Sequence, residues 1–237
     1  MSPVEVAVDP DIKKDAILRR YLDLPKLLDL LHSRSLYLRR ADGFSDRFEG
    51  AIIPSFRKLM DEAHQRGEFE HNADYFYRRS RTGNFVSCWS VGAKDNMALW
   101  QLYGGVKTCV AVTTTVEKLL SVACSWKESA LIHRVRYIDH SKNPDMLIGK
   151  YSDVLRYKNE SYAYENELRL IVPRQGKGWE SNPQAIRLPI SKLSDLVRSV
   201  VVAPEAENWF YDAVSDLCKR YELDAPVRRS KLAFMPV

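Results

Sequence analysis

Two glutamates that stand two residues apart, Glu165 and Glu167, are the residues of this chain whose types and spacing best suit a chemical role. They lead into an apolar, β-prone run, and a strand over residues 162–172 is expected. In an extended strand, residues i and i+2 point to the same face, so both carboxylates and Arg169 would project together, opposite a mainly apolar side. Carboxylates paired in this way either polarise a substrate or lie in solvent.

The composition indicates a globular protein and limits the kinds of ligand that its charge favours. The 237 residues, 45% of them hydrophobic and 28% charged, are enough to bury a full core and fit one domain. The net charge of +5 is a mild excess, well short of the basic block that a dedicated nucleic-acid binder carries. The charge therefore permits an anionic ligand without requiring one.

Cysteine and histidine spacing argues against a metal site. The five histidines form no HExxH or similar cluster, and no CxxC or CxH spacing occurs among Cys88, Cys109, Cys124 and Cys218. Reduced thiols in a cytosol are expected. The first residues lack an apolar signal-peptide core, and no stretch approaches the ~18 apolar residues that a membrane span needs. The sequence thus predicts a cytoplasmic protein with no metal and no membrane partner.

The elements that must position these residues follow from periodicity and turn signals. Residues 1–14 are expected to be a loose lead-in, and residues 15–237 a single α+β domain with a helical insertion near 55–80. Residues 16–22 suit either a strand or a helix. Helices are predicted at 23–32, 96–103, 116–124, 144–163 and 208–221. Strands are predicted at 35–39, 85–91, 106–115, 131–138, 185–190 and 196–203, with an edge strand over 227–235. The strands are too irregularly spaced for a doubly wound fold.

Four separated segments match a known family. They are Arg20-Tyr21, residues 35–38 with 44–49, residues 86–90 with 97–103, and residues 164–169. In this order they resemble the prokaryotic domain-of-unknown-function family numbered twenty-nine seventy-one, over most of residues 18–203. Where that family usually has Asn-Asp-Pro-Phe-Glu, this chain has Ser45-Asp46-Arg47-Phe48-Glu49.

The same segments are more distantly similar to the mono-ADP-ribosyltransferases. That resemblance implies a mixed or antiparallel split sheet, NAD as the substrate, and an E-x-E pair that ends in the catalytic glutamate, here Glu165 and Glu167. It also implies that Arg20, with its neighbour Tyr21, holds the dinucleotide. Ser87 and Ser90 would support the site, although Ser-Cys-Trp-Ser departs from the usual Ser-Thr-Ser.

The residue types suit that chemistry. Breaking a nicotinamide–ribose bond passes through an oxocarbenium-like state, which the carboxylate of Glu167 would stabilise where water is excluded. Glu165 would orient or deprotonate the acceptor. The guanidinium of Arg20 matches a diphosphate. An aromatic wall for the nicotinamide is expected from Trp89, Trp100 and Tyr103.

The loop after residue 40 is expected to border the substrate. It carries Asp46, Phe48 and Glu49 among turn residues, and polar loops with interleaved aromatics often bind ligands. The prediction is that Arg20, Ser87 and Glu167 line one cleft. The acceptor stays open between protein, nucleic acid and a small molecule, and the resemblance implies a toxin or a phage-defence effector.

Other interpretations stay open. A Glu-x-Glu-x-Arg face is often only solvated, and Trp89, Trp100 and Tyr103 are more often core residues than a ligand shelf. A non-catalytic module that binds nucleic acid or protein would instead use basic residues near aromatic ones: Arg78, Arg79 and Arg81 beside Tyr75, Phe76 and Tyr77, and also Arg228 and Arg229. If Arg20, Ser87 and Glu167 converge in one pocket, the enzyme is favoured. If the arginines form one continuous basic face, the non-catalytic binding module is favoured. A nuclease is disfavoured because Arg169 stands where a D…ExK site needs lysine.

Overall fold

The computed structural model describes residues 5–46, 48–142 and 144–233. These residues divide into two compact units, each built from three separate stretches of the chain. The first unit comprises residues 5–7, 38–87 and 129–186, and the second comprises residues 8–37, 88–128 and 187–233. Sequence neighbours therefore often belong to different units, and each unit depends on contacts between distant stretches.

The first unit contains the helical insertion and the strands around Glu167. Its helices and strands are α2 (Pro54–Gln65), α3 (Ala73–Thr82), β6 (Ala130–Arg134), β7 (Arg136–Ile138), β8 (Tyr157–Asn159) and β9 (Glu167–Pro173). Short 3₁₀ helices are η1 (Ala41–Gly43), η2 (His140–Lys142), η3 (Asp153–Arg156), η4 (Glu160–Glu165) and η5 (Trp179–Ser181). Four strands have residues in both units: β1 (Val6–Val8), β3 (Ser35–Arg40), β4 (Asn84–Val91) and β10 (Ala185–Pro189).

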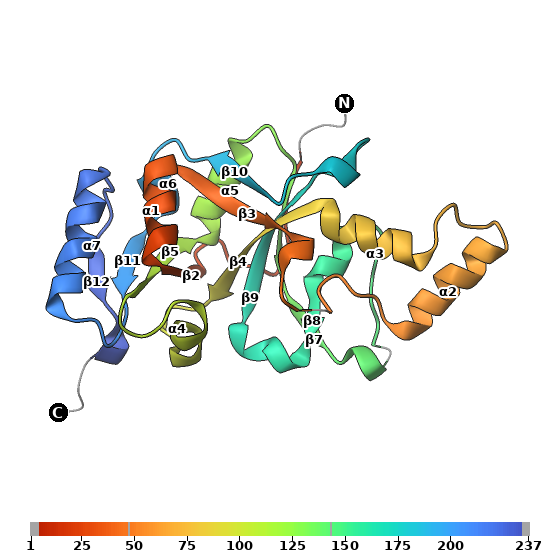
Figure 1. Cartoon of the computed structure of the whole chain (residues 1–237), viewed down its shortest axis with the longest axis horizontal. Coiled ribbons are helices and arrows are strands. Elements are labelled where there is room, and N and C mark those ends of the chain that lie inside the picture. Colours follow the sequence, from red (N-terminus) through yellow and green to blue (C-terminus); the bar gives the residue numbers. More distant parts are fainter. Residues whose placement is uncertain (1–4, 47, 143, 234–237) are drawn as a thin grey trace. The chain divides into compact units, whose positions relative to one another are not determined.

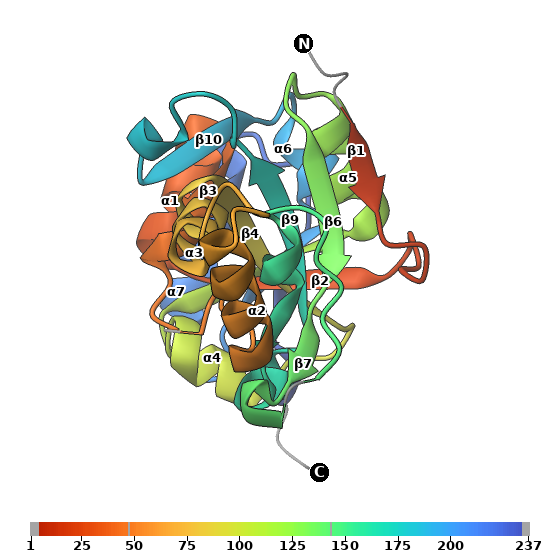
Figure 2. The same ribbon diagram turned by 90° about the vertical axis from the view of Figure 1, so that its right-hand side faces the viewer.

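Strand β9 carries Glu167 and Arg169 in the first unit. It pairs antiparallel with β6, so that Arg134 lies opposite Leu168 and His133 opposite Arg169, and Figure 2 shows the two strands side by side. Residues 167–172 are all buried, whichever face they occupy. A strand covered on both faces reads as a nearly continuous apolar run, which explains the Leu, Ile and Val residues here. Strands β7 and β8 form a separate parallel pair.

The second unit contains further strands and helices. Its elements are β2 (Ile17–Asp23), α1 (Leu24–Ser33), α4 (Met97–Tyr103), β5 (Cys109–Thr115), α5 (Val116–Cys124), α6 (Leu193–Leu196), β11 (Ser199–Val202), α7 (Asn208–Arg220), β12 (Val227–Arg229) and η6 (Lys231–Ala233). Strand β5 pairs antiparallel with β2 and with β11, and β11 pairs parallel with β12. Helix α7 packs beside β12 (Figure 1).

The predicted fold class is confirmed. The chain is α+β with both parallel and antiparallel strand pairs, and two helices, α2 and α3, form the insertion expected near residues 55–80. Residues 17–23 resolve as a strand, because β5 pairs with all seven of them. Helix α1 begins after Asp23 as expected, and the carboxylate of Asp23 accepts a hydrogen bond from the N–H of Lys26 (2.9 Å).

Four element predictions are wrong. The strand predicted over 131–138 is two strands, because β6 pairs with β9 and β7 pairs with β8. The edge strand predicted over 227–235 ends at Arg229, because residues 231–233 form η6. Residues 144–163 do not form a helix: the N–H groups of Gly149 and Lys150 donate to the carboxylate of Asp153 (2.8 and 2.7 Å), which makes a turn, and residues 157–159 pair with β7 as a strand. The strand predicted over 162–172 begins only at Glu167, because residues 160–165 form η4.

Some predictions stay open. The division into a lead-in and one domain over residues 15–237 stays a prediction, although residues 6–8 of the lead-in form β1. Arg47 of the loop motif and residues 234–235 of the expected edge strand lie outside the described residues, and β12 covers only Val227–Arg229 of that strand. Within the described ranges, no helix has the length and apolar character that a membrane span requires.

Candidate active site

A left-handed residue brings Glu165 and Glu167 together. Helix η4 ends at Glu165, and Asn166 follows with φ 45° and ψ 56°, a conformation that asparagine tolerates better than most residues. The side-chain carbonyl of Asn166 accepts a hydrogen bond from Arg134 (2.7 Å), and its N–H donates to the carbonyl of Ala163 (3.1 Å). The expected meeting of the two carboxylates therefore occurs, but through a turn rather than along one extended strand.

The ammonium group of Lys158 contacts both carboxylates. Lys158 lies in β8 and donates to Oε2 of Glu165 and to Oε2 of Glu167, the latter at 3.2 Å. Its Nζ also stands 4.7 Å from the ring centroid of Tyr162. The side chains of Lys158, Glu165 and Glu167 are 10%, 8% and 4% exposed, so the three charges are held out of water.

Arg169 fixes Glu167 from the other side. All five of its N–H groups have an acceptor: two on Glu167 (2.9 and 3.2 Å), two on Glu49 (one of them at 2.9 Å) and the carbonyl of Leu155 (2.8 Å). The paired N–H groups grip each carboxylate at both oxygens, which fixes its orientation. Because Glu49 lies 120 residues before Arg169, this contact ties the loop after η1 to β9.

The buried cluster carries more negative than positive groups. Within the described part of the chain it holds three carboxylates, on Glu49, Glu165 and Glu167, and two cations, on Lys158 and Arg169. Burial raises the pKa of Glu49 above its ordinary value, even though Arg169 opposes this shift. Burial alone would lower the pKa of Lys158, but its carboxylate neighbours, Glu167 first, raise it above the ordinary value.

Tyr137 completes the cluster. The N–H of Glu167 donates to the hydroxyl of Tyr137 (2.8 Å), and Tyr137 lies opposite Lys158 in the parallel β7–β8 pair. Burial raises the pKa of Tyr137 to about 12, so this phenol stays protonated at neutral pH and can donate a hydrogen bond of its own. The cluster thus combines three carboxylates, the cations of Lys158 and Arg169, and a neutral hydroxyl, with all of its charged side chains at most 10% exposed.

Such an arrangement can stabilise developing positive charge. Oriented charges act more strongly in a water-excluded site, because little solvent screens them. A third positive charge beside Glu165 and Glu167 would balance the three carboxylates. No three His, Cys, Asp or Glu side chains in the described residues are arranged so that they could hold a metal ion.

Three structures of DarT from Thermus sp. 2.9 are similar to this chain in fold. DarT in complex with NAD⁺ has a TM-score of 0.45 and 8% sequence identity, over 94% of this chain and 100% of that chain. The complexes with carba-NAD⁺ and with ADP-ribosylated ssDNA each have a TM-score of 0.42 and 8% identity, over 93% of this chain and 97% and 96% of those chains. No protein-family model and no curated protein sequence matches the chain. Membership of the numbered domain family stays a prediction.

The loop predicted to border the substrate joins this cluster through Glu49. Asp46 accepts a hydrogen bond from the N–H of Phe48 (2.9 Å), and the Phe48 ring, 51% exposed, lies 5.5 Å from the ring of His140. Glu49 is buried on Arg169. The loop therefore presents its glutamate inward and its phenylalanine partly to solvent, and its substrate role stays a prediction.

The second unit contains most of the residues predicted to bind the dinucleotide. Arg20 is half-buried: its guanidinium donates to the carbonyl of Tyr37 (3.3 Å) and stands 5.9 Å from the Trp89 ring centroid. Burial lowers the pKa of Arg20 from its ordinary value. Ser90, opposite Arg19 in the β2–β4 pair, is half-buried, and Tyr103 is 46% exposed.

Two of the predicted aromatic residues lie in a hydrophobic core cluster. The rings of Tyr21 and Trp100 meet edge-on at 4.8 Å, and the Tyr21 hydroxyl accepts a hydrogen bond from the N–H of Asn96 (3.1 Å). Trp89 is also buried. Ser87 belongs to the first unit, where its side chain is fully buried. The binding roles of all these residues stay predictions.

Sequence reasoning missed the partners of the E-x-E pair. Lys158 and Tyr137 carry no motif, and Lys158 fell within a stretch predicted to be helical. Arg169 lies on the face of Glu167 as expected, and because it is 1% exposed, the solvated face that the sequence left open as an alternative does not occur at this residue. The one available signal was the apolar run Leu170-Ile171-Val172 directly after Arg169, which indicates a strand buried on both faces.

Proposed function

We propose that the protein is an NAD-consuming enzyme of the ADP-ribosyltransferase kind, which transfers ADP-ribose to an acceptor or to water, with Glu167 as the catalytic carboxylate. One observation carries the proposal: Glu165 and Glu167 both contact a single buried cation, the ammonium of Lys158. The order of motifs along the sequence, which resembles that of ADP-ribosyltransferases, supports the same assignment.

The reaction breaks the bond between C1 of the ribose and the nicotinamide nitrogen, and the electron pair leaves with nicotinamide. The sugar passes through an oxocarbenium-like cation, which Glu167 stabilises. An oxygen or nitrogen of the acceptor, or a water oxygen, then forms the new bond to C1, and Glu165 takes its proton.

Lys158 occupies the place that such a cation requires. Its ammonium contacts both carboxylates, which are only 8% and 4% exposed, so the sugar can reach them only after Lys158 moves aside. The exchange of one cation for another leaves the net charge of the cluster unchanged. In this proposal the carboxylates are oriented before the substrate arrives, by Arg169 and by the turn at Asn166.

The test is the rate at which nicotinamide is released from NAD, followed by proton NMR, for the wild type and for Glu167→Gln. Gln keeps the shape of the side chain but not its charge, so the rate is expected to fall by about a hundredfold or more, with NAD affinity nearly unchanged. Glu160→Gln is the matched control, because Glu160 is an exposed glutamate of the neighbouring η4.

Two outcomes would contradict the proposal. A wild-type protein that neither binds nor consumes NAD, or a Glu167→Gln variant with unchanged turnover, would show that the cluster only fixes the loop at Glu49 to β9. Circular dichroism of both variants separates loss of activity from loss of folding.

A non-catalytic binding module is the second candidate function. Helix α3 supports it less than the sequence implied, because fewer of its arginines are exposed. Arg79 donates to the carbonyl of Gln175 (2.7 Å) and Arg81 donates to the hydroxyl of Tyr77 (2.6 Å), and both side chains are half-buried. Arg78 is the exposed one of the three. Arg228 and Arg229 belong to the second unit.

A further inference from the structure

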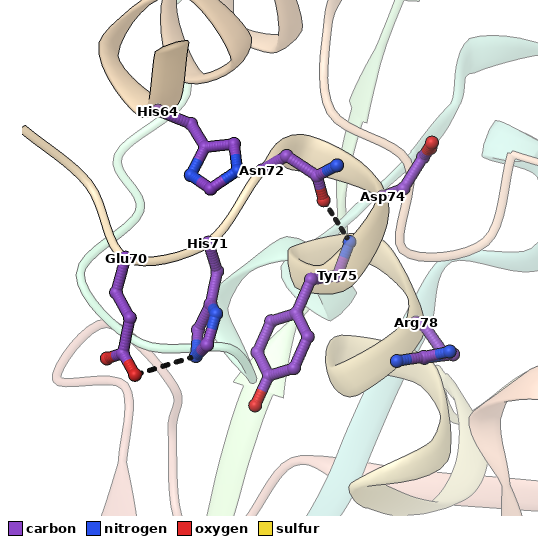
Figure 3. A pocket seen from close by; sticks show the side chains of 7 residues that line it. All are labelled: His64, Glu70, His71, Asn72, Asp74, Tyr75 and Arg78. Carbon is purple, nitrogen blue, oxygen red and sulfur yellow. Dashed lines mark hydrogen bonds and ion pairs between the residues drawn. The ribbon is translucent and has the colours of Figure 1, made fainter. Parts of the chain in front are cut away.

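The helical insertion carries a pocket that the proposed reaction does not use. It has a volume of about 410 Å³, within the range of small-molecule sites, and lies beside the first turns of α3 (Figure 3). Its walls include His64, Glu70, His71, Tyr75 and Arg78. All of these residues belong to the first unit, and none contributes to the carboxylate cluster.

Arg78 provides an anion-binding group. Its guanidinium carbon stands 5.9 Å from the Tyr75 ring centroid and 5.7 Å from that of Trp179. Among the described residues it has these two ring contacts but no hydrogen-bond or ion-pair partner, so its five N–H groups are available to a ligand. A guanidinium supported by aromatic faces presents a planar set of donors that matches phosphate.

Two stacked rings stand between Arg78 and the opposite side of the pocket. The His71 and Tyr75 rings lie 3.6 Å apart with an interplanar angle of 28°, and Tyr75 meets Trp179 edge-on at 5.7 Å. Both rings are half-exposed, so part of each is open to a ligand. A planar heterocycle can extend such a stack, as nucleobases do on aromatic side chains.

Acceptors line the side of the pocket away from Arg78 (Figure 3). The carboxylate of Glu70 is 88% exposed and lies 3.7 Å from Nε2 of His71. His64 Nδ1 is 2.9 Å from the carbonyl oxygen of Phe69, so in the neutral ring Nδ1 carries the hydrogen and Nε2 is an acceptor. The other carboxylate of the pocket, on Asp74, is compensated by an ion pair with Arg57.

We propose that this pocket binds a nucleoside monophosphate unit whose base carries an exocyclic amine. Arg78 binds the phosphate, the His71–Tyr75 stack contacts the base, and Glu70 accepts a hydrogen bond from the amine. His64 Nε2 accepts from a sugar hydroxyl. This chemistry is shared by a free nucleotide and by one nucleotide of a single strand.

Isothermal titration of the full chain tests the proposal with AMP, ribose 5-phosphate and a single-stranded oligoadenylate. Arg78→Gln is expected to weaken AMP and ribose 5-phosphate by about tenfold or more, because both lose a charge-assisted contact. Arg78→Lys keeps the charge but loses the planar fork, so its affinity should lie in between. Glu70→Gln is expected to weaken AMP and leave ribose 5-phosphate unchanged.

Two controls test whether the loss of binding is specific to the pocket at Arg78. Arg198→Gln removes an exposed arginine of the second unit and should change nothing. Because AMP is also half of NAD, AMP binding is measured as well in Arg20→Ala, the variant expected to weaken NAD binding, where AMP binding through the pocket should persist. Binding of oligoadenylate through Arg78 without binding of AMP would identify the source as a strand rather than a free nucleotide.

Three results would overturn the proposal. They are no binding of AMP or oligoadenylate by the wild type, equal losses in Arg78→Gln and Arg198→Gln, and loss of AMP binding in Arg20→Ala with none in Arg78→Gln. Circular dichroism of each variant shows that the helices are intact. None of these outcomes depends on whether NAD is consumed.

Discussion

At the scale of single residues, the cluster around Glu167 depends on compensation of charge. Arg169 and Lys158 are the two cations beside three buried carboxylates, and each is hydrogen-bonded to more than one of them. Removing one partner of a buried ion pair leaves an uncompensated charge, whose desolvation is not repaid. Every residue of the cluster is therefore expected to affect stability, which any test of activity has to take into account.

Lys158→Met should destabilise the protein strongly. Methionine keeps the length of the side chain but removes the charge that Glu165 and Glu167 share. The free energy of unfolding in urea at neutral pH is expected to fall by about 3–5 kcal/mol. Lys150→Met, at an exposed lysine of the preceding loop, is the control and should stay within about 0.5 kcal/mol of the wild type. Equal losses in both variants would contradict a compensating role for Lys158.

The buried carboxyl group of Glu49 should make the free energy of unfolding depend on pH. Burial raises the pKa of Glu49 in the folded state above its ordinary value of 4.5, so the folded state binds this proton more tightly than the unfolded state. The contribution to stability is then complete below pH 4.5 and is lost as the pH rises through the folded pKa. Relative to Glu49→Gln, the wild type should lose up to about 1.4 kcal/mol per pH unit in that window.

The measurement is the free energy of unfolding of both proteins at a series of pH values above 4.5, with Glu160→Gln as a control for an exposed glutamate. Parallel curves for the wild type and Glu49→Gln would show that Glu49 does not titrate differently on folding.

At the scale of elements, the junction of η4 and β9 decides where both glutamates point. The single left-handed residue Asn166 ends one element and begins the other, and β9 then continues as a strand buried on both faces. If the strand had continued through residue 165, Glu165 would lie two residues before Glu167 along the same strand. The turn brings it to the lysine of β8 instead.

Asn166→Val should therefore disturb the junction, whereas Asn166→Gly should preserve it. Valine in the left-handed region costs about 1–2 kcal/mol, while glycine adopts that region freely, and both variants lose the side-chain bond to Arg134. Chemical denaturation of the two variants is expected to place Asn166→Val below Asn166→Gly by about 1 kcal/mol or more. Equal stabilities would mean that the backbone at Asn166 relaxes without cost.

At the scale of the whole molecule, the residues predicted to serve one dinucleotide come from both compact units. Glu165 and Glu167 belong to the first unit, and Arg20 to the second. The prediction that they act on the same ligand rests on the order of motifs in the sequence. Binding and turnover measurements on the full chain test it directly.

Arg20→Ala should weaken NAD binding by about tenfold or more, because a charge-assisted contact to the diphosphate is lost in both the ground state and the transition state. Turnover at saturating NAD should stay close to that of the wild type, the reverse of the pattern expected for Glu167→Gln. The control is Arg220→Ala, which removes an exposed arginine at the end of α7. Unchanged NAD affinity in Arg20→Ala would exclude the diphosphate role.

Local signals in the sequence determined a large part of this fold. Asp23 and Pro25 mark the start of α1, the boundaries of α5 are those predicted, and the alternation of side chains correctly placed Arg169 on the face of Glu167. These features depend on backbone preferences and on spacings of a few residues, which the sequence displays directly.

Only the tertiary structure decided what surrounds the two glutamates. Glu49 reaches Arg169 from 120 residues away, and Lys158 meets the carboxylates because β8 pairs with β7 rather than forming the predicted helix. Residues 17–23 became a strand because β5 offers them hydrogen bonds along their whole length. Each of these outcomes is a contact between distant stretches, and the free energy of such a contact depends on burial and pairing partners that no local pattern specifies.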